Sequence, residues 1–118
     1  YGRRNNDWKD AKVSQEQVAW LREELGRGES PCLVFIHQRL DVDPPFGVGN
    51  ARLIRRMLEA SGRVRGVFQG HEHAGAATEI NGIRYTTLPA MVEGLEMTSA
   101  AIQILEADDT WAWCLRGR

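Results

Sequence analysis

The sequence of 118 residues lacks any apolar run that approaches the roughly 20 residues a membrane-spanning helix requires. It also lacks a basic surplus, because 15 Lys and Arg stand against 16 Asp and Glu and leave a formal net charge of −1. These two absences argue against a membrane protein and against generic nucleic-acid binding, which depends on excess positive charge. The composition, 42% hydrophobic and 26% charged, is that of one globular domain.

Cysteine is scarce, and an initiator methionine is missing. Cys32 and Cys114 lie far apart in the sequence and form no CxxC pair of the kind that binds metal, so we expect two buried free thiols. The chain begins with Tyr1, and no signal-type apolar stretch follows. We therefore expect a piece of a longer protein, with a cytoplasmic location.

The spacing of apolar residues predicts two helices and two strands in the first part of the chain. Residues 1–13 are polar and aperiodic and form a separate N-terminal segment. Ser14 and Gln17 form a capping box, and Asn50 is a candidate cap of a second helix. The apolar run at 32–36 is typical of a strand buried on both faces. The predicted order is a helix over 15–26, a strand over 32–36, a helix from 50 to 62 and a strand over 64–68.

The second part of the chain has the pattern of antiparallel hairpins. Asn81-Gly82, the strongest short hairpin signal, stands between two strand-like segments at 76–80 and 83–88. Asp108-Asp109 stands in the same way between 99–105 and 110–115. The predicted fold class is therefore α+β, with an α/β start built on one βαβ unit and antiparallel hairpins after it.

All three histidines of the sequence follow predicted strands. His37 comes directly after the strand at 32–36, and His71 and His73 follow the strand at 64–68. A βαβ unit has parallel strands, whose carboxyl ends meet at one edge of the sheet, where ligands of α/β sheets bind. Neutral imidazole is a good ligand for Zn, Mn, Fe or Ni. The sequence thus predicts that His37, His71 and His73 bind metal.

The His71-Glu72-His73 segment adds an expectation of geometry. In an extended segment, residues i and i+2 point the same way, so both imidazoles would face one site and Glu72 would face away. Gly70 permits a sharp exit from the strand and a close approach to a ligand.

Charged side chains near this edge are candidates for a further role. Arg39 is a candidate substrate-binding residue, because a guanidinium can make a bidentate contact with phosphate. Metal sites that hydrolyse phosphoesters usually contain carboxylates as well. The nearby carboxylates are interpreted as solvated loop charges: Asp41, Asp43 and Glu93.

Three segments resemble one known family. Val34-Phe35-Ile36-His37-Gln38, Val67-Phe68-Gln69-Gly70-His71-Glu72-His73 and Asn81-Gly82-Ile83-Arg84-Tyr85 resemble the C-terminal half of calcineurin-like metallophosphoesterases. Within that superfamily the chain looks closest to the phosphatase branch that includes manganese-dependent ADP-ribose/CDP-alcohol diphosphatases. The resemblance begins at about residue 14, which divides the chain into the polar segment 1–13 and a C-terminal domain part at 14–118.

The resemblance implies a two-sheet β-sandwich flanked by helices, with two divalent metal ions (Mn, Fe or Zn) at the strand ends. His37 and His71 would then bind one metal and His73 the other. The family's Asp-x-His, Gly-Asp-x-x-Asp and Gly-Asn-His-Asp/Glu motifs do not occur in these 118 residues. We therefore expect the C-terminal fragment of a metal-dependent phosphatase or phosphodiesterase that cleaves phosphoester or pyrophosphate bonds. By itself the fragment would be inactive and would bind one metal ion or none.

The expected substrate is a phosphorylated small molecule or a nucleotide-type compound, bordered by residues 38–49 and 88–97. The open edges of the strands at 32–36 and 64–68 predict a homodimer, with a strand or the first helix as candidates for exchange. Two alternatives stay open. One is a non-catalytic binding or dimerisation domain with at most a single structural metal, and the other is a zinc hydrolase with an unrelated site.

Overall fold

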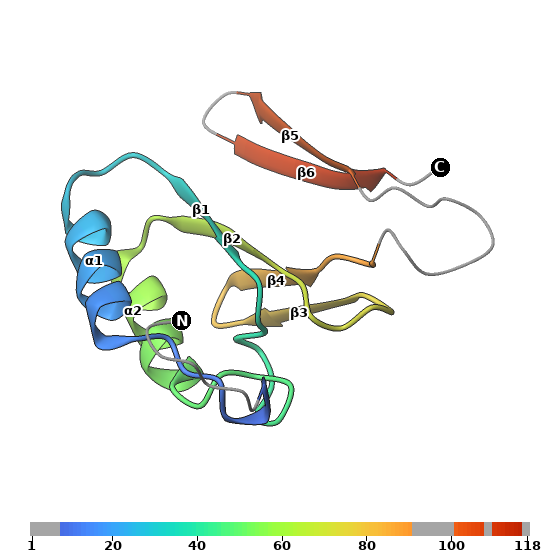
Figure 1. Ribbon diagram of the computed structural model, residues 1–118. Helices are drawn as coiled ribbons and strands as arrows, with labels where there is room; N and C mark the ends of the chain where they lie inside the picture. Colours follow the sequence, from blue (N-terminus) through green and yellow to red (C-terminus); the bar gives the residue numbers. More distant parts are fainter. Residues whose placement is uncertain (1–7, 91–100, 108–109, 117–118) are drawn as a thin grey trace.

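The computed structural model describes residues 8–90, 101–107 and 110–116 (Figure 1). It has the predicted α+β class. The elements in chain order are the 3-10 helix η1 (Trp8–Asp10), α1 (Gln15–Gly26), β1 (Cys32–Ile36), α2 (Ala51–Ser61), β2 (Val64–Gln69), β3 (Ala76–Ile80), β4 (Ile83–Thr87), β5 (Ala101–Ala107) and β6 (Thr110–Arg116). Each predicted helix and strand is present, with ends that differ by at most two residues from the prediction.

The two helices begin differently. The hydroxyl of Ser14 accepts a hydrogen bond from the amide of Gln17 at 3.3 Å, so the predicted cap of α1 is confirmed. Asn50 stands at the predicted N-cap position of α2, but its side chain makes no capping hydrogen bond to that helix. Instead, Asn50 bonds to both the amide and the carbonyl group of Val13, at 3.1 and 2.9 Å. Asn50 therefore ties the segment before α1 to the start of α2, and Gly62, with φ of 65°, ends α2 as predicted.

The main sheet has four strands in the order β1-β2-β4-β3. β1 runs parallel to β2, and β2 runs parallel to β4, whereas β3 pairs with β4 in the antiparallel direction. At the carboxyl ends, Ile36 is paired with Gln69, and Gln69 with Thr87. Three parallel strands therefore end side by side, and this edge carries the residues of the candidate site.

Two hairpins complete the described structure. β3 and β4 are joined by Asn81 and Gly82, whose φ angles of 51° and 79° are those of the primed turns that join strands through two residues. β5 and β6 form a separate two-stranded antiparallel sheet, with Ala107 paired to Thr110. Both predicted hairpins are confirmed.

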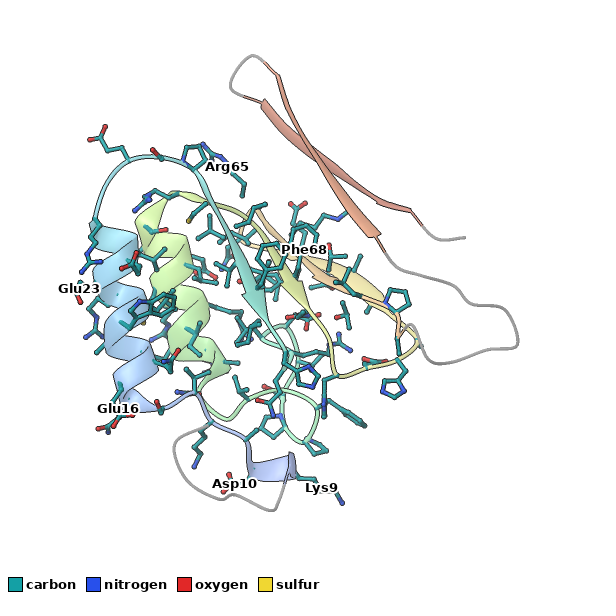
Figure 2. The ribbon with its side chains drawn as sticks, turned by 45° about the horizontal axis from the view of Figure 1, so that its top comes forward. Lys9, Asp10, Glu16, Glu23, Arg65 and Phe68 are labelled. Carbon is teal, nitrogen blue, oxygen red and sulfur yellow. The ribbon has the colours of Figure 1, made fainter. Side chains whose placement is uncertain are left out.

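The core lies between the helices and one face of the four-stranded sheet (Figure 1). Its buried members are contributed by α2, by the loop after β1 and by the strands: Leu40, Val48, Ala51, Ile54, Leu58, Val64, Val67, Ile83 and Tyr85. Leu21 and Leu25 of α1 pack against this cluster. The charged side chains of Glu16 and Glu23 are exposed on α1 (Figure 2). The helices thus cover one face of the four-stranded sheet, whose strand ends carry the candidate site.

The prediction that β1 is buried on both faces is wrong. Val34 and Ile36 pack against the core, but Phe35 points to the opposite face and is 63% exposed. Its ring stacks on that of Phe68 in β2, with centroids 5.3 Å apart (Phe68 is labelled in Figure 2). Strand side chains alternate between faces, and the helices cover the face opposite Phe35. An apolar run therefore does not by itself show that both faces are covered.

Cys32 is a free cysteine and is half-buried rather than buried. The predicted burial of Cys114 falls outside the residues whose side chains are described. Neither α1 nor α2, nor any other helix in the described ranges, is long and apolar enough to cross a membrane.

Candidate metal centre

The ends of β1 and β2 bring His37 and His71 together. His37 follows the last residue of β1, and His71 follows β2 after Gly70. Their ring centroids are 5.6 Å apart, and the ring planes meet at 79° in an edge-to-face arrangement. Two imidazoles from segments far apart in the sequence therefore lie at the carboxyl edge of the sheet.

Gly70 allows this close approach. Its amide donates a hydrogen bond to the carbonyl oxygen of His37 at 2.9 Å. A β-carbon at position 70 would lie 3.3 Å from that oxygen and 3.5 Å from Nδ1 of His37. The absence of a side chain thus lets the two strand ends meet and leaves room for the imidazole of His37.

The segment after Gly70 is a turn, so the expectation of an extended His71-Glu72-His73 segment is wrong. His71 has a φ of 72°, in the left-handed region that few residues other than glycine adopt. The carbonyl oxygen of Glu72 accepts a hydrogen bond from the amide of Gly75 at 3.3 Å, which closes the turn. The Glu72 side chain makes an ion pair with Arg39 rather than facing away from the other site residues. Period-two alternation does not hold through this turn.

A cavity of about 280 Å³ lies at this edge. All three histidines line it, together with Gly70 and Glu72. Residues 88–90, which follow β4, also line it. His73 is exposed, and its carbonyl oxygen accepts a hydrogen bond from the amide of Ala90 at 3.1 Å. The histidines therefore share one cavity, while the expected border at 91–97 falls outside the described residues.

The three histidines are the candidate metal ligands at this edge. His37 and His71 are adjacent imidazoles, and His73 adds a third at the cavity wall. Within residues 8–90 and the two described strands that follow, no group of three or more His, Cys, Asp or Glu side chains is arranged to hold a metal ion. The metal-binding role of the three histidines thus stays a prediction. Further donors would have to complete a two-metal site.

Arg39, the candidate phosphate-binding residue, is buried and paired. Its Nε and Nη2 atoms donate to the two carboxylate oxygens of Asp41 at 3.0 and 2.8 Å, in a bidentate contact. Its Nη1 atom pairs with Oε2 of Glu72. The Arg39 side chain is 10% exposed and that of Asp41 is 1% exposed. A phosphate contact by Arg39 stays a prediction, and Glu72 is the more exposed of the two carboxylates that already pair with this side chain.

Gln69 extends this network across the sheet edge. Its Oε1 atom accepts a hydrogen bond from the amide of Leu40 at 2.9 Å. Its Nε2 atom donates to Oδ1 of Asp41 and to the hydroxyl of Thr87, the latter at 3.1 Å. The loop after β1 is thus fastened to the end of β2, and Gln69 links this strand end in turn to the end of β4. Gln69 has no role in the sequence-based prediction, although a polar residue directly after the apolar Val67 and Phe68 is a usable signal.

The interpretation of Asp41 as a solvated loop charge is wrong, because its carboxylate is buried in this network. Burial raises the pKa of Asp41. The hydrogen bonds from Arg39 and Gln69, together with the charge of Arg39, lower it by more, so the pKa lies below its ordinary value of 3.8. Asp43 is exposed, as expected, and Glu93 falls outside the described residues. Asp41 is therefore a charged anchor for Arg39.

The arrangement of strands and helices is similar to that of a solved structure, a dimetal phosphatase from Danio rerio. The TM-score is 0.76 at 23% sequence identity, and the match covers 89% of this chain and 36% of that chain. The chain has part of the dimetal phosphatase fold. It spans little more than a third of that phosphatase. No protein-family model matches the sequence, and no curated protein is similar to it.

Proposed function

We propose that this chain is part of a metal-dependent phosphohydrolase of the calcineurin-like metallophosphoesterase type. The observation that carries the proposal is the pair of adjacent imidazoles, His37 and His71, at the carboxyl edge of parallel strands. That edge belongs to part of a dimetal phosphatase fold. The substrate would be a phosphorylated small molecule or a nucleotide-type compound with a phosphoester or pyrophosphate bond.

In this proposal, His37 and His71 bind one divalent ion through neutral imidazole nitrogens, and His73 contributes to a second. Bound divalent ions would neutralise the charge of the substrate's phosphoryl group and orient it for hydrolysis. The chain's own contribution is to hold the imidazoles at one cavity wall and to admit the phosphate beside them. Carboxylate ligands would come from sequence that carries the aspartate motifs missing here.

Metal titration tests the first part of the proposal. Calorimetry with Zn²⁺ or Mn²⁺ should detect one weak site in the 118-residue chain, and His71→Ala should abolish it. Arg22→Ala, an exposed change on α1, is the matched control and should bind as the wild type does. Equal metal affinity in the wild type and in His71→Ala would contradict the proposal.

Activity tests the second part. The 118-residue chain should show negligible phosphodiesterase turnover, because the bridging carboxylate of a two-metal site is missing. A longer chain that includes the aspartate motifs should hydrolyse phosphoesters and should lose that activity with His73→Ala. Rapid metal-dependent hydrolysis by the 118-residue chain alone, removed by His73→Ala, would show that the site needs no further carboxylate.

A non-catalytic binding or dimerisation domain with at most a single structural metal is the second candidate. It is favoured by one observation, which is that the described residues offer no donor group of three or more. A longer chain that binds at most one metal ion and hydrolyses no phosphoester would support this alternative.

A further inference from the structure

We propose that Arg39 is a positioning residue, which holds the turn containing His71 against the loop that follows His37. The inference rests on the proposed metal-binding function and identifies what sets the geometry of that site. Arg39 lies two residues after His37, and Glu72 lies one residue after His71. The Arg39–Glu72 ion pair therefore joins the two turns that carry the paired imidazoles.

The arginine end of this link is fixed. Arg39 binds Asp41 through two parallel hydrogen bonds, and Asp41 in turn accepts a hydrogen bond from Gln69. Gln69 is 1% exposed and is bonded to the amide of Leu40 and the hydroxyl of Thr87. Bidentate arginine–carboxylate contacts fix orientation as well as distance. The guanidinium is therefore a rigid anchor set into the sheet edge.

The Glu72 end of the ion pair is less constrained than the Arg39 end. The Glu72 side chain is 39% exposed and lines the cavity, in contrast to the buried Asp41. Glu72 is thus the side chain through which Arg39 restrains the turn, in addition to the backbone hydrogen bond from Ala90 to His73.

The Arg39–Glu72 ion pair matters because the backbone of His71 has a left-handed conformation. A residue other than glycine keeps a left-handed conformation only where its surroundings hold it there. On one side of His71, the amide of Gly70 is bonded to the carbonyl oxygen of His37. On the other side, Glu72 is paired with Arg39. The backbone bonds of Gly75 to Glu72 and of Ala90 to His73 remain when the ion pair is lost. The turn then lacks its side-chain restraint, so the imidazole of His71 shifts relative to that of His37.

Glu72→Gln removes the charge and keeps the shape, so it tests the inference directly. The metal-free fold should be nearly as stable as the wild type, because Glu72 is partly exposed. Zn²⁺ affinity should fall about tenfold, and the visible spectrum of bound Co²⁺ should change, because the ligand geometry is altered. Glu79→Gln, an exposed change of the same kind on β3, is the matched control and should alter neither quantity.

Arg39→Lys provides a second variant, since a lysine keeps the charge but cannot contact Asp41 and Glu72 with a planar fork. It should also weaken Zn²⁺ binding. In metal-free protein, amide hydrogen exchange at residues 71–73 should be faster in both variants than in the wild type. This readout needs no metal and remains usable if a variant binds none.

The outcomes separate the two proposals. Wild-type affinity, an unchanged Co²⁺ spectrum and unchanged exchange in Glu72→Gln would overturn the positioning role and leave the proposed metal site intact. Failure of the wild type to bind Zn²⁺, Mn²⁺ or Co²⁺ would overturn the metal site and the positioning role together.

Discussion

The carbonyl oxygen of His37 accepts a hydrogen bond from the amide of Gly70 at 2.9 Å, and this bond joins the ends of two parallel strands directly. The contact leaves little room, since a β-carbon on residue 70 would lie 3.3 Å from the same oxygen. The strand ends would have to separate by a few tenths of an ångström to admit a methyl group. The spacing of His37 and His71 thus depends on a glycine between them.

Gly70→Ala should therefore lower the free energy of unfolding by about 1 kcal/mol, the lower end of overpacking effects, and weaken Zn²⁺ binding. Urea denaturation and calorimetric titration measure the two effects. Gly26→Ala is the control, because a β-carbon there meets no atom within 4 Å. Unchanged stability and metal affinity in Gly70→Ala would show that the strand ends adapt freely.

Asp41 should make the stability depend on pH in the acid range. Its pKa is lower in the folded protein than the ordinary 3.8, so the folded state favours the charged form. The stabilisation is present in full above the pKa of the unfolded chain, near 3.8, and is lost as the pH falls towards the lower folded-state pKa. Asp41→Asn removes this dependence.

At pH 7, Asp41→Asn should lower the free energy of unfolding by about 2 kcal/mol, because Arg39 loses charge-assisted hydrogen bonds. The difference from the wild type should shrink below pH 3.8. Urea denaturation at a series of pH values measures it. Asp43→Asn, on an exposed neighbour, should change the stability by less than about 0.5 kcal/mol at any pH. If the free energy of unfolding of the wild type and that of Asp41→Asn differ by the same amount at every pH, a buried and charged Asp41 is contradicted.

Much of this arrangement follows from local pattern. Apolar spacing marks the helices and strands, and a βαβ order alone implies that His37 and His71 leave one edge of a sheet. The network behind them could not be predicted in this way. Arg39 resembles a surface arginine in the sequence, and only the folding of its loop onto Gln69 at the end of β2 buries it. The left-handed turn at His71 is likewise fixed by contacts with residues distant in sequence.

The same limit applies to Asn50, whose type and position are those of a helix cap. Its amide group meets the backbone of Val13 instead, across a separation of 37 residues. A tertiary hydrogen bond here replaces the local one that the sequence indicates. Local chemistry identifies the groups that need a partner, but tertiary packing selects the partner.

The hydroxyl group of Tyr85 is a polar group buried in the apolar core. Within the described residues its hydroxyl has no hydrogen-bond partner, and the residue is fully buried in the core. Burial, together with the charge of Glu59, raises the pKa of Tyr85 to about 12. The folded state therefore binds this proton more tightly than the unfolded chain does. Its contribution to stability should be lost as the pH rises from about 10 to about 12.

Tyr85→Phe should leave the free energy of unfolding at pH 7 unchanged or raise it by up to about 1 kcal/mol, because an unpaired buried hydroxyl is removed. It should also abolish the loss of stability between pH 10 and pH 12. Thr87→Val is the contrasting control. Its hydroxyl accepts a hydrogen bond from Gln69 at 3.1 Å, so its removal should cost about 1 kcal/mol. Clear destabilisation by Tyr85→Phe would indicate that the phenol has a partner.

The last prediction concerns self-association through β1. In the described sheet β1 lies at one edge, and an edge strand presents unpaired backbone groups that readily pair with another chain. The exposed ring of Phe35 adds apolar surface beside that edge. We therefore predict a homodimer in solution in which two β1 edges meet, with or without exchange of a strand or of α1.

Light scattering after size-exclusion chromatography should give twice the mass of one chain. Phe35→Lys should shift the protein to monomer, because a charge beside the edge opposes pairing and removes the apolar contact. Trp20→Lys places the same charge on α1, at a side chain that is 55% exposed, and should leave the dimer intact. A wild-type chain that stays monomeric at high concentration would mean that the β1 edge is protected without a partner. A dimer that persists in Phe35→Lys would mean that the interface lies elsewhere.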